Sequence, residues 1–159
     1  MNLYPLIFST KELVYGNGFL AEVEIRGRAL GVDEGDGDWW FNGVEPGGLA
    51  EGGQSLNEAY HAFRDTLKEI LVDIAYEVAD FEAFERRVER FGQDVNRTND
   101  ADWWKCVEAV RKGELHAPAK DMREEKAEDE AQVTITAVDP AKNLLDPSRN
   151  ELGELAAAA

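Results

Sequence analysis

The stretch Trp39–Val78 decides how this chain folds, and it reads WWFNGVEPGGLAEGGQSLNEAYHAFRDTLKEILVDIAYEV. It joins a short aromatic strand to glycine-rich turns and then to a long helix. Ser55 and Glu58 stand three residues apart at the start of the helix, which is the spacing of a capping box. Apolar residues then recur every three or four positions as far as Ile74 and Ala75, so one stripe of the helix should be buried. A helix this one-sided needs an apolar surface, and the preceding strands are its natural supplier.

Extended segments precede this stretch. Residues 3–15 predict an edge strand or two short pieces, because Pro5 cannot donate a hydrogen bond to a ladder. The turn Gly16-Asn17-Gly18 separates them from a segment that begins at Phe19 and alternates between apolar and polar residues towards Val32. This alternation predicts a strand with one buried and one wet face.

Residues 80–115 predict a helical appendage. Asp80 can cap a first helix, and Gly113 can end a second one. The pair invites a helix-turn-helix interpretation, but the second helix has few basic residues and the whole chain is acidic. We therefore do not expect it to bind DNA, and we expect Trp103 and Trp104 to serve packing.

The C-terminal third contains one clear strand. Residues 116–131 predict a charged linker, and residues 140–159 have little pattern and predict a mobile tail. Between them, residues 132–138 alternate strictly and predict a strand. Because a lone strand is not stable, it should pair with the N-terminal sheet or with another subunit.

Together these segments predict an α+β fold. It would consist of a small antiparallel sheet of three or four strands with one long helix packed on a face, plus the helical appendage. Residues 1–78 would form this core, and the strand at 132–138 would return to it.

The charge of the chain limits its partners. Acidic residues outnumber basic ones 33 to 17, for a net charge of -16. Such a chain should repel nucleic acid and anionic membranes and attract basic proteins, although the charge could also serve solubility alone. The single cysteine, Cys106, allows no intrachain disulfide, which fits a reducing cytosol. There is neither a membrane-length apolar run nor a secretory signal at the N-terminus, so we expect a cytoplasmic protein.

The segment Asp33–Asp38, DEGDGD, is strongly acidic. Its carboxylates suggest calcium, but their spacing departs from that of a calcium-binding loop and the required terminal glutamate is missing. A hairpin turn, in which Asp and Gly supply unusual backbone angles, explains the composition better. A metal-dependent hydrolase that uses this turn stays as an alternative function.

Few residues suggest other chemistry. His61 and His116 have no companions at ligand spacing, and Cys106 has no histidine near it in sequence. A phosphate-binding loop and a nucleophile elbow are both missing from the sequence. We therefore expect a binding protein rather than an enzyme, without a cofactor or a bound metal.

The adjacent tryptophans Trp39 and Trp40 should point to opposite faces of the sheet, because successive side chains of a strand alternate. One can pack under the long helix. The other could anchor a partner, or it could be covered by the C-terminal helices or by a second subunit.

The order of motifs after the aromatic strand resembles that of the HicB-like antitoxin family. The motifs are Glu45-Pro46-Gly47-Gly48-Leu49, then Glu51-Gly52, then Ser55-Leu56-Asn57-Glu58-Ala59. The resemblance covers roughly residues 19–75 of the chain. It implies a toxin–antitoxin system, in which the antitoxin covers the catalytic surface of a small basic ribonuclease toxin with a double-stranded-RNA-binding type of fold.

One departure from the family pattern qualifies this expectation. Members of the family often carry a C-terminal DNA-binding module, and no convincing one is found here, so the chain could be an orphan relative with a different partner. An orphan dimeric structural or interaction protein is therefore a further alternative.

We expect a homodimer that forms through a sheet edge, the exposed tryptophan, or both. The candidate partner-binding residues are Asp36, Asp38, Trp39, Trp40, Asn42 and Glu45.

Overall fold

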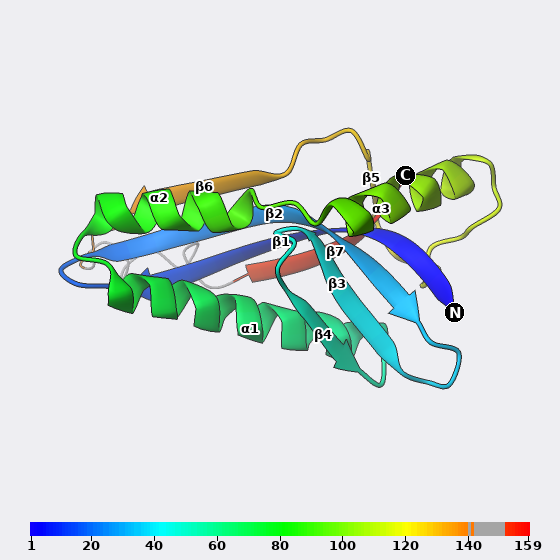
Figure 1. Ribbon diagram of the computed structural model, residues 1–159, viewed down its shortest axis with the longest axis horizontal. Coiled ribbons are helices and arrows are strands. Elements are labelled where there is room, and N and C mark those ends of the chain that lie inside the picture. The colour runs from blue at the N-terminus through cyan, green and yellow to red at the C-terminus, as the bar shows by residue number, and fades with distance from the viewer. Residues whose placement is uncertain (140, 142–151) are drawn as a thin grey trace.

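The computed structural model describes residues 1–139, 141 and 152–159 and shows helices packed on both faces of a β-sheet (Figure 1). The fold class is mixed α+β, as predicted. In chain order the elements are β1 (Asn2–Tyr15), β2 (Leu20–Asp33), β3 (Trp39–Glu45), β4 (Ala50–Gly53), α1 (Leu56–Glu77), α2 (Phe81–Gly92), α3 (Arg97–Arg111), β5 (Glu124–Glu125), β6 (Gln132–Ala137) and β7 (Leu152–Ala158).

The sheet has seven strands instead of the three or four that were predicted, and it is mostly antiparallel. Its order is β4-β3-β2-β1-β7-β5, with β6 added beside β2. β1 pairs with one edge of β2 along its whole length. The other edge of β2 is shared, because β3 pairs with Arg28–Asp33 and β6 pairs with Ala21–Arg26. β3 and β6 therefore lie one beyond the other along the same edge.

Each face of the sheet has its own apolar cluster. The α1 face packs against α1 and α2, and its strands contribute Phe8, Val23, Ile25 and Phe41 among others. The α3 face packs against α3 around Trp103, which is fully buried. Because successive strand residues point to opposite faces, the long runs of buried residues in β1 and β2 serve both clusters.

Side-chain caps begin all three helices. The Ser55 hydroxyl accepts the Glu58 N–H at 3.0 Å, which confirms the predicted cap of α1. The Asp80 carboxylate accepts a hydrogen bond from a backbone N–H at the start of α2. The side-chain amide oxygen of Asn96 accepts one at the start of α3. Each cap satisfies a backbone donor that would otherwise have no partner inside the helix.

The helices α2 and α3 pack on the sheet and do not form the predicted appendage. The connection between them passes beside the end of β3, where the Asn96 N–H donates to the Val44 carbonyl at 2.9 Å and the Gly47 N–H donates to the Asp94 carbonyl at 2.8 Å. A side chain at Gly47 would lie 2.2 Å from the Asn96 nitrogen, so glycine allows this close approach. The chain thus crosses from the α1 face to the α3 face in the gap between β3 and β6.

The segment predicted to be a charged linker is tied to the sheet. Within it, β5 pairs in parallel with β7, and the Ala127 N–H donates to the Ala159 carbonyl at 2.9 Å. The segment 132–138 contributes β6, which pairs with β2. The linker interpretation is therefore wrong for residues 124–127.

The expectation of a mobile tail does not hold for residues 152–158. These residues form β7, which pairs with β1 along Leu6–Lys11 and lies between β1 and β5. The side chains of Ala156, Ala157 and Ala158 are buried. In the remainder of the predicted tail, Ala141 is described, whereas 140 and 142–151 lie outside the described residues.

Within the described ranges, none of the helices combines the length and the apolar character needed to cross a membrane.

Candidate partner-binding surface

The acidic segment between β2 and β3 is a tight turn. Gly35 and Gly37 have φ values of 86° and 99°, which only glycine adopts at little cost. The Asp33 carboxylate accepts the Gly35 N–H at 2.9 Å, and the Asp36 carboxylate accepts the Asp38 N–H at 3.0 Å. The segment thus has the turn chemistry that its composition predicted, and two of its carboxylates are held by the backbone.

The acids of this turn are partly or fully exposed to solvent. In the described part of the chain, none of Asp33, Glu34, Asp36 and Asp38 forms an ion pair with a lysine or arginine. Across residues 1–139, 141 and 152–159, no three His, Cys, Asp or Glu side chains are grouped closely enough to hold a metal ion. The hydrolase alternative therefore finds no ligand set in these residues, whereas the turn presents its negative charge outward.

The two tryptophans of β3 have different surroundings. Trp39 stacks on Tyr4 with 5.7 Å between ring centroids and packs against the apolar cluster of the α1 face. Trp40 points to the opposite face and is 43% exposed. Its ring lies against Gly52 of β4, where a side chain would meet it at 3.4 Å. Trp40 is thus the exposed tryptophan, and Trp39 is better explained as part of the core than as a partner contact.

The other two candidate residues of β3 also differ. Asn42 lies two residues after Trp40 and therefore shares its face of the strand. Glu45 is instead engaged within the fold, because its carboxylate lies 3.1 Å from an amino group of Arg28. Asp36 and Asp38 in the turn, and Trp40 and Asn42 on β3, thus lie along one hairpin, and we call these four residues the hairpin surface.

A hollow of about 570 Å³ beside α3 was not predicted. Arg28 is one of the residues that line it, and its guanidinium is 2.6 Å from Asp100 and 4.9 Å from the ring centre of Trp103. The lining residues are Arg28, Glu45, Gln93, Asp100, Trp104, Ala127, Glu128, Asp129, Glu130 and Ala131. They come from β2, β3, α3 and two connections, so no local motif could have predicted this grouping.

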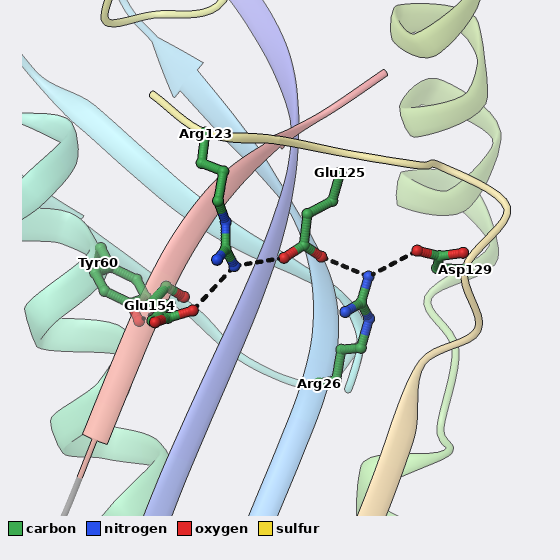
Figure 2. A network of polar contacts seen from close by, with 6 residues as sticks. All are labelled: Arg26, Tyr60, Arg123, Glu125, Asp129 and Glu154. Atoms are coloured by element: carbon green, nitrogen blue, oxygen red, sulfur yellow. Dashed lines mark hydrogen bonds and ion pairs between the residues drawn. The ribbon is translucent and has the colours of Figure 1, made fainter. Parts of the chain in front are cut away.

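Bases on the α3 face are largely neutralised by nearby acids. Figure 2 shows Arg26 between Glu125 and Asp129, and Arg123 between Glu125 and Glu154. These contacts hold the charged segment 123–129 across β2 and β7. These arginines are already paired with acids within the fold. The excess of negative charge therefore resides on other acids, such as those of the hairpin surface.

A second ionic cluster is buried under α1. The Glu12 carboxylate, only 4% exposed, lies 3.6 Å from Arg64 and 3.7 Å from Lys68. Two cations beside one carboxylate explain how a charge is tolerated there. The Tyr60 hydroxyl donates to the Glu154 carbonyl at 3.1 Å nearby, and its burial raises the pKa of Tyr60 to about 12. The positive charge of Arg64 opposes this shift, and Glu154 and Glu12 add to it.

This pKa predicts how Tyr60→Phe behaves in alkali. At neutral pH the variant should be less stable by about 1 kcal/mol, the usual net contribution of one hydrogen bond. The neutral phenol stabilises the native state fully below pH about 10, and this contribution is lost as the pH rises towards about 12, because the unfolded chain ionises first. The wild type should therefore lose about 2 to 3 kcal/mol relative to Tyr60→Phe over that range.

Urea unfolding of both proteins at pH 7, 10 and 11.5 measures this difference in the free energy of unfolding. A difference that stays constant with pH would contradict a buried, neutral Tyr60. His61→Gln, an exposed change on the same helix, should leave the alkaline behaviour unaltered.

Cys106 is not poised as a nucleophile. Partial burial, and then the negative charge of Asp102, raise the pKa of its thiol, so the reactive thiolate is disfavoured at neutral pH.

Comparison of the chain with protein-family models, with curated proteins and with solved structures gave no match. The resemblance of residues 19–75 to HicB-like antitoxins therefore stays a prediction.

Proposed function

We propose that this protein is an antitoxin-like binding module that neutralises a small basic ribonuclease toxin. The observation that carries the proposal is the hairpin surface, where the exposed ring of Trp40 lies next to a turn of outward-facing acids. The motif order at 45–59, which resembles that of HicB-like antitoxins, supports the same class of partner.

The hairpin surface has the two components that such binding needs. The carboxylate of Asp36, and that of Asp33 in the same turn beside this surface, are held in place by backbone hydrogen bonds, so ordering them costs little when a basic surface approaches. They can occupy positions where a ribonuclease would bind phosphates. Trp40 adds a rigid aromatic ring, and tryptophan is common among the residues that dominate binding energy.

The net charge acts at longer range. At -16 the protein attracts a basic partner before contact, which raises the association rate at low salt. The proposal also places the protein in the cytoplasm, where a ribonuclease toxin meets its RNA, and a single cysteine suits that compartment.

The partner can be sought directly. Tagged protein expressed in its own host should retain a small basic protein, and the purified pair should lack the ribonuclease activity of that protein alone. If no such protein is retained, or if the ribonuclease stays active in the complex, the proposal is wrong.

Substitution of Trp40 in the hairpin surface should weaken binding of the partner. Trp40→Ala should weaken the complex by about 2 kcal/mol or more, roughly 30-fold, as for a central aromatic contact. The matched control is Tyr76→Ala, which removes an aromatic ring that is 84% exposed on α1, and it should have no effect. Calorimetry measures both, and equal losses would contradict the assignment of Trp40.

Charge variants test how much the acids of the hairpin surface contribute to the long-range attraction of a basic partner. Asp36→Asn with Asp38→Asn should slow association and flatten its dependence on salt, because fewer charges attract the partner. Glu69→Gln with Asp73→Asn makes the same change in net charge on the exposed side of α1 and should alter the rate less. Stopped-flow association rates at several salt concentrations measure the two pairs.

An orphan dimeric interaction protein is the second candidate function. It is favoured by one specific observation: among the described residues β6 pairs with β2 alone, and its six residues QVTITA carry no charge.

A further inference from the structure

Strand β6 has one free edge. It pairs with β2 only, and among the described residues no other strand lies on its far side. The Val138 N–H donates to the Leu20 carbonyl of β2 at 2.9 Å. Because backbone groups alternate along a strand, Thr134 and Thr136 also point their N–H groups at β2, whereas Val133 and Ile135 point theirs at the free edge.

Within the described residues, this edge lacks the usual protection against pairing. Exposed edges in soluble proteins normally carry a lysine, a proline, a bulge or a covering segment. The six residues of β6 read QVTITA, with neither a charge nor a proline, in a chain that is 31% charged. They also favour extended structure, since Val, Ile and Thr have high strand propensity.

The neighbouring helix leaves the edge open. α2 packs on the α1 face, and a side chain at Gly92 would lie only 2.4 Å from Val133. Since α2 contacts β2 as well as β6, it sits over the boundary between these strands and not beyond β6. Figure 1 shows β6 at the outer margin of the sheet.

We propose that the free edge of β6 pairs with the same edge of a second copy of this chain, antiparallel, about a two-fold axis at Ile135. This register places Ile135 opposite Ile135 of the other copy and Val133 opposite Ala137, on the α1 face. On the α3 face, Thr134 lies opposite Thr136. Every outward N–H and C=O group from Val133 to Ala137 then finds a partner, and the two sheets become one.

A second copy fits this edge because the strand is complementary to itself. All opposed residues in this register share a face, and none is charged, so no like charges meet across the two-fold axis. Glu130 and Asp139 flank the strand, and two chains of charge -16 repel one another at a distance. The dimer must therefore be held by short-range contacts, and added salt should tighten it.

The inference is independent of the basic partner. The hairpin surface adjoins the half of β2 that pairs with β3, whereas β6 adjoins the other half. Salt also separates the two: it should weaken the complex with a basic toxin and strengthen the dimer.

Sedimentation of the full chain over a range of concentrations, at low and high salt, tests the dimer. We expect a dimer at tens of micromolar that tightens with salt. Thr134→Lys should raise the dissociation constant about tenfold or more, because it puts a charge on each side of the joined edges. Its fold should persist, since Thr134 is exposed and lies opposite Glu24 of β2, with which the lysine can pair.

Thr98→Lys is the matched control, because it makes the same charge change at an exposed position of α3. It should leave the dimer intact. A monomer at both salt concentrations, a dimer that dissociates as salt is raised, or equal effects of the two lysine variants would overturn the proposal.

A cross-link tests the register without relying on Thr134→Lys. In a Cys106→Ser background, Thr134→Cys with Thr136→Cys should form disulfides between protomers under mild oxidation, because opposed residues outside the hydrogen-bonded pairs have Cα atoms about 4.5 Å apart. Thr98→Cys in the same background should remain monomeric on a non-reducing gel. Absence of the cross-linked dimer would overturn pairing in this register.

Discussion

Deletion of Leu152–Ala159 is expected to leave a chain that does not fold cooperatively at room temperature. This segment contains β7, which pairs with β1 along Leu6–Lys11 and supports β5 on its other side. Its removal would strip one edge of a central strand and take the partner of Ala127 as well. At about 1 kcal/mol for each of several backbone hydrogen bonds, with the burial of three alanines added, the loss is about 5 kcal/mol or more.

A loss of this size matches the whole stability of many domains, which is about 5 to 15 kcal/mol. Circular dichroism during urea unfolding, together with binding of a hydrophobic dye, measures the outcome. Glu154→Gln is the control, because it keeps the backbone of β7 and removes only an exposed ion pair with Arg123, which should cost less than about 1 kcal/mol. A truncated chain with the unfolding midpoint of the full chain would show that β7 does not contribute to the sheet.

Trp103→Ala is expected to lower the free energy of unfolding by about 4 kcal/mol. The Trp103 side chain is fully buried on the α3 face, and its indole N–H donates to the Leu6 carbonyl at 3.1 Å. Alanine would leave a large cavity, remove the hydrogen bond from the indole to Leu6, and leave Arg28 without the ring that lies beneath it. Trp103→Phe should cost less, because it fills most of the space and loses mainly the hydrogen bond.

The neighbouring tryptophan supplies the control for this variant. Trp104 contacts Trp103 edge-on at 5.0 Å between ring centroids, but it is 36% exposed. Trp104→Ala should therefore cost about 1 to 2 kcal/mol. Urea unfolding followed by far-ultraviolet circular dichroism avoids the loss of fluorescence signal. Equal costs for the two substitutions would show that α3 is not anchored through Trp103.

Local patterns predicted those elements whose own residues, within a few positions of one another, carry the signal of a helix, a strand or a turn. The capping box at Ser55 and the periodic stripe that follows it predicted α1, and the strict alternation of 132–138 predicted β6. Each of these signals is short-range chemistry, a hydrogen bond to the next turn or a side chain every second residue. The glycines and aspartates of 33–38 likewise predicted their turn.

The candidate site could be predicted only in part for the same reason. Trp40 and the acids of the turn lie on one hairpin, so their proximity follows from the sequence. Which tryptophan is exposed depends on α1, which covers only the face that carries Trp39. The ion pair of Glu45 with Arg28, and the hollow beside it, join residues from elements far apart in the chain.

The sequence by itself determined the α+β class, the long capped helix, the acidic turn and the net charge of -16, because these depend on composition and on neighbouring residues. Only the tertiary structure decided that an alanine-rich segment is a strand within the sheet and that two helices lie on opposite faces. Alanine has no strong preference for a strand, so Ala156–Ala158 form one only because the edge of β1 offers backbone partners. The crossing between β3 and β6 has the same origin, since it requires a gap that exists only when both strands share one edge of β2.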